Sequence, residues 1–176
     1  NQLFYQCVSH VSRVPAVSSA VFAMMLAAPV AALRRLGLDA MLSGRGFFRG
    51  SSILLTGTPG TGKTSVAACF AQAAARRGDR ALFFSFEESP NQIVRNLRSI
   101  GLRLEPLVQQ GTLRFHAARP TLCGLEMHLA TMFKEIGAYR PAVVIVDPIT
   151  SLLAAGTDHE TKGMVTRLID FMKNGQ

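Results

Sequence analysis

Four short runs rich in aliphatic and aromatic residues divide the chain into repeating units. They occupy residues 53–55, 81–86, 112–116 and 142–146, and turn or polar residues follow each of them. Runs of this length and composition are typical of strands buried on both faces of a sheet. We therefore expect four central strands.

Segments with helical spacing of apolar residues separate these runs. They span residues 63–77, 90–100 and 125–136, and a last helix follows the capping box Thr157-Asp158-His159-Glu160. Gly137 is the predicted stop of the third helix. Strand and helix thus alternate four times, which predicts an α/β fold with a parallel sheet, right-handed crossovers and helices on both faces.

A glycine-rich stretch lies between the first strand and the first helix. It fits the pattern G-x-x-x-x-G-K-[ST] at every fixed position and reads Gly57-Thr58-Pro59-Gly60-Thr61-Gly62-Lys63-Thr64. Where glycines leave the backbone bare, successive N–H groups can wrap a phosphate, and the helix N-terminus adds favourable partial charge. The stretch is therefore predicted to be a phosphate-binding loop, the alternative being a glycine-rich turn before an ordinary helix.

The side chains of this loop predict a nucleoside triphosphate bound with Mg²⁺. Lys63 would reach the β- and γ-phosphates as a point charge, and the Thr64 hydroxyl would be a ligand of the Mg²⁺ that bridges them. We expect the whole loop, with Ser65 directly behind it, to contact the nucleotide.

Acidic residues end two other predicted strands. Glu87 and Glu88 follow the strand at 81–86, and Asp147 follows the strand at 142–146. In open α/β sheets ligands bind outside the carboxyl ends of the strands, so these groups should meet the loop. We predict that Asp147 holds Mg²⁺ through a water and that the two glutamates orient and deprotonate the attacking water. The alternatives are an exposed pair that favours the next helix N-terminus and, for Asp147, an acidic turn residue.

Composition narrows the class of protein. The net charge is +8, with 19 Lys and Arg against 11 Asp and Glu, but the basic residues are scattered, which favours solvated helix faces over a nucleic-acid groove. The cysteines, Cys7, Cys69 and Cys123, are too widely spaced for a disulfide framework or a metal pair. Reduced thiols predict a cytoplasmic protein.

Residues 1–35 differ in composition from the rest of the chain. No charge occurs from Val14 to Leu33, which resembles a short membrane segment or signal core, but Pro15, Pro29 and the many alanines argue against a membrane. We expect an upstream helix or sequence foreign to the domain, and an ATPase-like domain over residues 36–176. Because the chain starts at Asn1 and ends directly after a helical pattern, we expect it to be a fragment.

These residues together resemble the KaiC family of RecA-like ATPases, and most of all its second, C-terminal ATPase repeat. The resemblance covers about residues 36–176. It rests on Gly46-Phe47-Phe48-Arg49-Gly50, the loop at 57–64, Phe86-Glu87-Glu88-Ser89, Arg95-Asn96, Gly124-Leu125-Glu126 and Val146-Asp147-Pro148.

The resemblance implies a RecA-like P-loop NTPase domain, truncated here at its C-terminal side. Its cofactors would be ATP and Mg²⁺, bound between subunits of a homo-hexameric ring, and ATP would be hydrolysed slowly. Glu87 and Glu88 match the paired catalytic glutamates, and Lys63, Thr64 and Asp147 match the phosphate and magnesium ligands. Clock members also phosphorylate their own Ser and Thr residues, but those sites would lie beyond Gln176.

The resemblance also implies a strand order. The strand at 53–56 would lie beside the strand that ends at Asp147, and it would form a bare sheet edge here because a later strand is not in the chain. Clock-protein partners are compatible with the resemblance, although no residue of the chain points to one.

Two other functions stay open from the sequence. One is a DNA-acting RecA relative, a recombinase or helicase, which the short, uncharged segment 151–157 disfavours because such proteins need basic loops after this strand. The other is an inactive nucleotide-binding or interaction module.

Overall fold

The computed structural model describes residues 19–25, 47 and 50–174. The strands are β1 (Ser19–Met25), β2 (Ser52–Gly57), β3 (Ala81–Ser85), β4 (Leu113–Ala117) and β5 (Val143–Asp147). The helices are α3 (Lys63–Arg76), α4 (Pro90–Ser99), α5 (Glu105–Gln109), α6 (Leu125–Tyr139) and α7 (Asp158–Asn174), with 3₁₀ turns η2 (Pro120–Leu122) and η3 (Ile149–Ala155).

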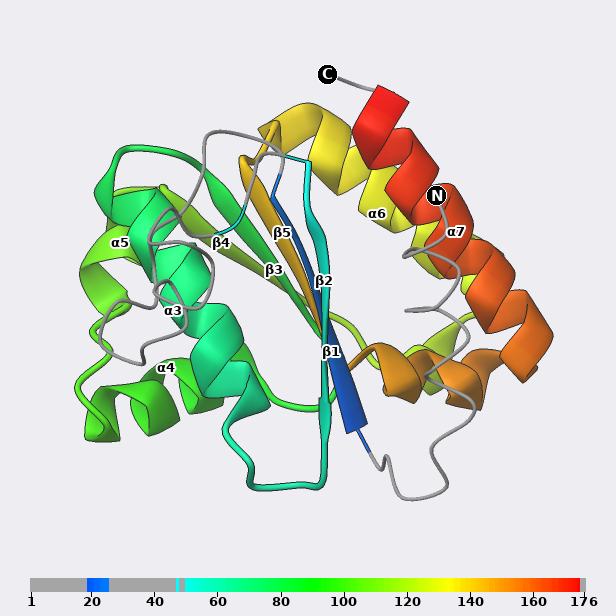
Figure 1. Ribbon diagram of the computed structural model, residues 1–176, viewed down its shortest axis with the longest axis horizontal. Coiled ribbons are helices and arrows are strands. Elements are labelled where there is room, and N and C mark those ends of the chain that lie inside the picture. The colour runs from blue at the N-terminus through cyan, green and yellow to red at the C-terminus, as the bar shows by residue number, and fades with distance from the viewer. Residues whose placement is uncertain (1–18, 26–46, 48–49, 175–176) are drawn as a thin grey trace.

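The strands form one sheet in the order β2-β1-β5-β3-β4. β3 pairs parallel with both β4 and β5, and β1 pairs antiparallel with both β2 and β5, so β2 points the same way as β5. Helices α3, α4 and α5 cover one face, and α6 and α7 cover the other (Figure 1). This confirms the predicted α/β fold, with its four strands in one direction and helices on both faces.

β1 corrects two predictions about the neighbours of β2. Residues 19–25 belong to the segment that was expected to be an upstream helix or foreign sequence, but they form a strand that separates β2 from β5. The strand that leads into the loop is therefore not beside the strand that ends at Asp147, although β2 does lie at the sheet edge. β1 is stabilised by pairing with β2 and β5 at once, which the local sequence does not reveal, and Val21 and Ala23 are fully buried.

Alternation along the strands divides the core into two layers. Phe83 and Ile145 face the cluster that α3, α4 and α5 cover, whereas Phe84 and Val146 face the cluster beneath α6 and α7. Both β3 and β5 are buried at every position, as expected of strands with helices on both faces. The central strands are thus fixed from both sides.

The sequence predicted the start of α7 correctly and the end of α6 wrongly. The capping box before α7 is confirmed, because Glu160 Oε2 accepts from the Thr157 backbone N–H and hydroxyl, both at 2.8 Å. The predicted stop at Gly137 is wrong, since α6 continues to Tyr139 and ends at Arg140 with φ 49°.

The short helix α5 was not predicted. Within the described ranges, none of the helices is long and apolar enough to span a bilayer.

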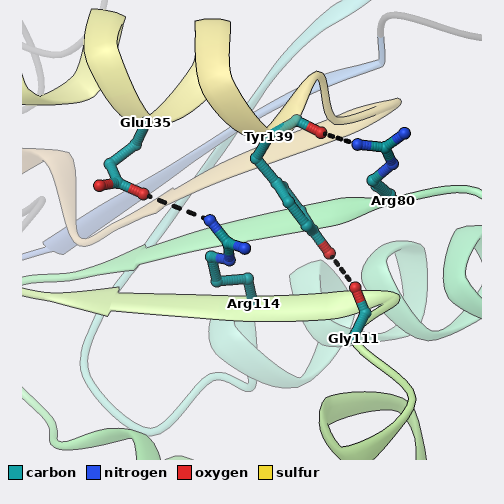
Figure 2. A network of polar contacts seen from close by, with 5 residues as sticks. All are labelled: Arg80, Gly111, Arg114, Glu135 and Tyr139. Carbon is teal, nitrogen blue, oxygen red and sulfur yellow. Dashed lines mark hydrogen bonds and ion pairs between the residues drawn. The ribbon is translucent and has the colours of Figure 1, made fainter.

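Tyr139 holds α6 against the amino ends of two strands, β3 and β4 (Figure 2). Its hydroxyl donates to the Gly111 carbonyl before β4 at 2.7 Å, and its own carbonyl accepts from Arg80 before β3 at 2.7 Å. The Arg114 guanidinium lies 4.3 Å from the centre of its ring and 3.7 Å from Glu135. These contacts explain why the helix runs past Gly137: its last turn is stabilised by packing and hydrogen bonds that its own sequence does not reveal.

Tyr139→Phe is expected to lower the free energy of unfolding by about 1 to 2 kcal/mol, because the Gly111 carbonyl loses its donor while the ring contacts remain. Urea unfolding of the two proteins measures this difference. Tyr139→Ala should cost clearly more, because it also removes a buried ring. Equal stability of Tyr139→Phe and the wild type would show that the hydroxyl contact contributes nothing.

Candidate functional site

The carboxyl ends of β2, β3 and β5 converge at one end of the sheet, opposite the end at which α6 finishes (Figure 1). Ser85 at the end of β3 is in register with Asp147 at the end of β5. The backbone N–H of Phe86 donates to the Asp147 carbonyl at 2.9 Å, which extends the pairing by one residue. This register brings Glu87 and Glu88 beside Asp147, as the sequence predicted.

Glycines shape the loop between β2 and α3. Gly60 and Gly62 both have φ 82°, a left-handed conformation that is strained for other residues, and Gly62 is the N-cap of α3. At Gly57 a Cβ atom would come within 2.9 Å of Thr61 Oγ1. The loop therefore needs glycine at the fixed positions of the motif for steric reasons, as well as for access of a phosphate to the backbone.

The ammonium group of Lys63 folds back over the loop. Its Nζ donates to the carbonyls of Gly57 at 3.0 Å and Thr58 at 2.7 Å, and it lies 3.3 Å from Thr61 Oγ1. Thr61 Oγ1 also donates to the Thr58 carbonyl at 2.8 Å. The lysine is thus held at the mouth of the loop by neutral acceptors, without a carboxylate partner among these contacts.

A cavity of about 350 Å³ joins the loop to the acidic residues. Lys63 is the only Lys or Arg among its lining residues, within the part of the chain that the structure describes. The lining comprises Pro59, Gly60, Gly62, Lys63, Thr64, Ser65, Ser85, Glu87, Glu88, Ile93, Asn96, Asp147 and Pro148. Of the predicted site residues, Gly57, Thr58 and Thr61 are not in this lining and instead shape the loop behind it.

Asp147 is the most perturbed of the acidic groups. Its side chain is 8% exposed, and this burial is the main cause that raises its pKa from 3.8 to about 6. A hydrogen bond with the Thr64 side chain lowers this pKa, the charges of Glu88 and Glu87 raise it further, and Lys63 lowers it. An ionised Asp147 is therefore unfavourable unless a cation lies near it.

The donor set fits a hard divalent cation such as Mg²⁺. Thr64 and Asp147 supply a hydroxyl and a carboxylate oxygen at one point, and the neighbouring glutamates add negative charge. Mg²⁺ typically takes one or two such protein ligands and completes its shell with phosphates and waters. Among the described residues there is no group of three His, Cys, Asp or Glu side chains that could hold a metal unaided.

Neutral donors contact the two glutamates. Ser151 in η3 donates its hydroxyl to Glu87 Oε1 at 2.6 Å, and Asn96 in α4 donates from Nδ2 to Glu88 Oε2 at 3.2 Å. Ser85 Oγ also donates to the backbone carbonyl of Glu88. The glutamates are thus fixed by elements on both faces of the sheet.

Sequence reasoning missed the contacts of Ser85, Asn96 and Ser151. Ser85 is the last residue of β3 and could have been found from its place just before the glutamates. The other two lie 8 and 64 residues from their partners, with no local pattern that links them.

Comparison with known proteins decides the family. The family model "ATPase: KaiC" matches residues 36–176. The chain belongs to the KaiC family. The KaiC2 circadian clock protein of Synechocystis sp. is 49% identical over 137 residues, which is 78% of this chain and 24% of that protein. The circadian clock oscillator protein KaiC of Thermostichus vulcanus is 38% identical over 136 residues, 77% of this chain and 26% of that protein.

The chain spans about a quarter of the length of these curated KaiC relatives. The matched region contains β2, β3, β4 and β5 of this KaiC-family domain, whereas β1 lies before residue 36. The boundary at residue 36 and the origin of residues 1–35 stay predictions.

Asp147→Asn should stabilise this KaiC-family domain at pH 7.5 in the absence of nucleotide and Mg²⁺. The rise in pKa from 3.8 to about 6 corresponds to about 3 kcal/mol of unfavourable burial of the ionised form. In the wild type, the protonated Asp147 carboxyl carries no such penalty below pH 3.8. The stability of the wild type then falls as the pH rises from 3.8 through 6, because the buried carboxyl must ionise. We therefore expect the variant to gain up to about 3 kcal/mol at pH 7.5 and almost nothing near pH 4.

Urea unfolding in EDTA at both pH values measures this effect. Asp170→Asn, which removes an exposed carboxylate on α7, is the control and should change the free energy of unfolding little at either pH. An Asp147→Asn variant no more stable than the wild type at pH 7.5 would contradict the account.

Proposed function

We propose that this domain binds ATP with Mg²⁺ and hydrolyses it. The observation that supports the proposal best is that residues of the phosphate-binding loop, both glutamates and Asp147 line the same cavity. Each part of an ATPase site comes from a different strand end, and the parts face one space. A structural role alone would not require that three carboxylates and a lysine share it.

The loop and Lys63 would bind the phosphates. The backbone N–H groups at the start of α3 are free of side chains at Gly60 and Gly62, and the helix N-terminus favours negative charge there. Lys63 already lies over the loop on neutral carbonyls, so it can turn its charge to a phosphate without breaking an ion pair.

Thr64 and Asp147 would hold the metal, Thr64 directly and Asp147 through a water. When bound, Mg²⁺ would neutralise charge on the β- and γ-phosphates. Thr64 is placed for this role because its side chain already contacts the Asp147 carboxylate. The cation would also offset the unfavourable burial of the ionised Asp147.

Glu87 and Glu88 would orient the attacking water and accept its proton on a carboxylate oxygen. Both line the cavity beside Asp147. A general base must lie within hydrogen-bonding reach of the water that it deprotonates, and these two carboxylates are the candidates in the described lining.

The finer parts of the proposal concern the intact protein. The described lining has no aromatic side chain, which supports nucleotide binding at a boundary between copies in a homo-hexameric ring, where a second subunit would contact the base. Transfer of the γ-phosphoryl group to a Ser or Thr of the intact protein, a cytoplasmic location and a clock role are parts of the proposal that only the family relationship supports. The segment after β5 has no Lys or Arg from 148 to 157, which supports hydrolysis in a ring over a DNA-acting role.

Lys63→Ala should weaken Mg·ATP binding at least tenfold, because the only described cation in the lining is lost and the phosphate charge is left to backbone N–H groups. Titration of both proteins with a fluorescent ATP analogue measures the dissociation constants. Lys134→Ala, an exposed lysine on α6, should bind like the wild type. Equal affinity for Lys63→Ala and the wild type would remove the central part of the proposal.

In the intact protein, Glu87→Gln with Glu88→Gln should leave ATP binding unchanged but slow hydrolysis roughly hundredfold, the usual scale for a lost general base. Phosphate release under saturating ATP measures the rate. Glu135→Gln, at the opposite edge of the sheet, is the control. Hydrolysis by the double variant at the wild-type rate would show that the pair is a structural feature of the strand end.

A further inference from the structure

We propose that Asn96 and Ser151 are positioning residues that fix the two glutamates for hydrolysis, each through one hydrogen bond. This inference rests on the proposed ATPase function and adds two residues to it. Neither residue belongs to the loop or to a strand end. They approach the acidic pair from opposite faces of the sheet, Asn96 from α4 and Ser151 from η3.

Asn96 acts on Glu88. It lines the cavity with Ile93, one helical turn earlier on α4, and its Nδ2 donates to Glu88 Oε2 at 3.2 Å. The helix is anchored, because Ser89 accepts from the Gln92 N–H at its N-terminus and Ile93 and Leu97 are buried. The amide is thus presented from a fixed element, which limits the rotamers that Glu88 can adopt.

Ser151 acts on Glu87. Its hydroxyl donates to Glu87 Oε1 at 2.6 Å, the short distance typical of a charge-assisted hydrogen bond. Ser151 lies four residues after Asp147 in η3, where Ile149 and Leu152 are buried in the core. Glu87 itself is exposed, so without this contact its side chain would sample many orientations.

The neutrality of both donors suits a catalytic pair. Arginine or lysine in the same places would neutralise the glutamates and compete with Mg²⁺ for them. An amide and a hydroxyl fix the direction of each carboxylate and leave its charge available to a water. A cavity that already holds three carboxylates needs such constraints, because mutual repulsion drives the side chains apart.

Double-mutant cycles in the intact protein test the proposal. Asn96→Ala and Ser151→Ala should each lower kcat roughly tenfold, the lower end of the cost of losing a supporting hydrogen bond, with an unchanged dissociation constant for Mg·ATP. Asn96→Ala should have no further effect in a Glu88→Gln background, and Ser151→Ala none in a Glu87→Gln background. Full additivity in both cycles, or a higher kcat in the single variants, would overturn the proposal.

Conservative variants separate positioning from packing. Asn96→Asp keeps the shape of the side chain but removes the donor, so it should be at least as slow as Asn96→Ala. Ser151→Thr keeps the hydroxyl and should restore most of the rate lost in Ser151→Ala. Asn91→Ala on α4 and Thr131→Val on α6, both outside the cavity lining, are the controls and should hydrolyse ATP like the wild type.

A measurement without turnover keeps the two proposals distinct. In NMR spectra of the 176-residue chain, the Asn96 side-chain amide signals should move in Glu88→Gln and stay in place in Glu87→Gln. Asn96 side-chain amide signals that stay in place in Glu88→Gln would contradict the contact between Asn96 and Glu88, even if ATP is hydrolysed. If the contact is present but the intact wild type does not hydrolyse ATP, the proposed function fails instead.

Discussion

The arrangement depends on one unfavourable group, the buried carboxylate of Asp147 at the end of β5. Its charge lies beside those of Glu87 and Glu88 in a cavity that contains a single described lysine, and burial raises its pKa to about 6. Such an arrangement weakens the nucleotide-free domain and favours binding of a cation. The unfavourable burial of the ionised Asp147 lowers the stability of the domain, and it is the physical basis of the magnesium site that we propose. Functional sites often carry such a cost in stability.

The rest of the sheet holds this edge in place. β3 and β5 are buried on both faces, and their parallel register fixes the distance between the glutamates and Asp147. At the amino edge, Tyr139 ties α6 to the starts of neighbouring strands through uncharged acceptors. Stabilising contacts and unfavourable charges therefore lie at opposite ends of the strands. The contacts at the amino ends stabilise the fold, and the groups proposed for catalysis lie at the carboxyl ends.

Local chemistry explains how much could be predicted from the sequence. A few consecutive residues are enough to identify the loop at 57–64, the acidic strand ends and the capping box at Thr157. The structure brings the loop and the acidic strand ends together at one cavity. β1 could not be predicted, because its place depends on pairing with β2 and β5, more than 25 and 115 residues away. The same holds for Ser151, whose partner Glu87 is 64 residues distant, and for the last turn of α6, which is stabilised by Gly111.

The most direct test of the central claim uses Mn²⁺ as a paramagnetic replacement for Mg²⁺. In the ¹⁵N-labelled chain with saturating ATP, Mn²⁺ should broaden the amide signals of residues 60–65, 87–88 and 147 far more than those of Gly111 and Arg114. The two edges are about 17 Å apart along a five-residue strand, so the contrast should be clear. Broadening that is absent with saturating ATP, or that is as strong at Gly111 as at Gly62, would contradict a metal–nucleotide site at the carboxyl edge.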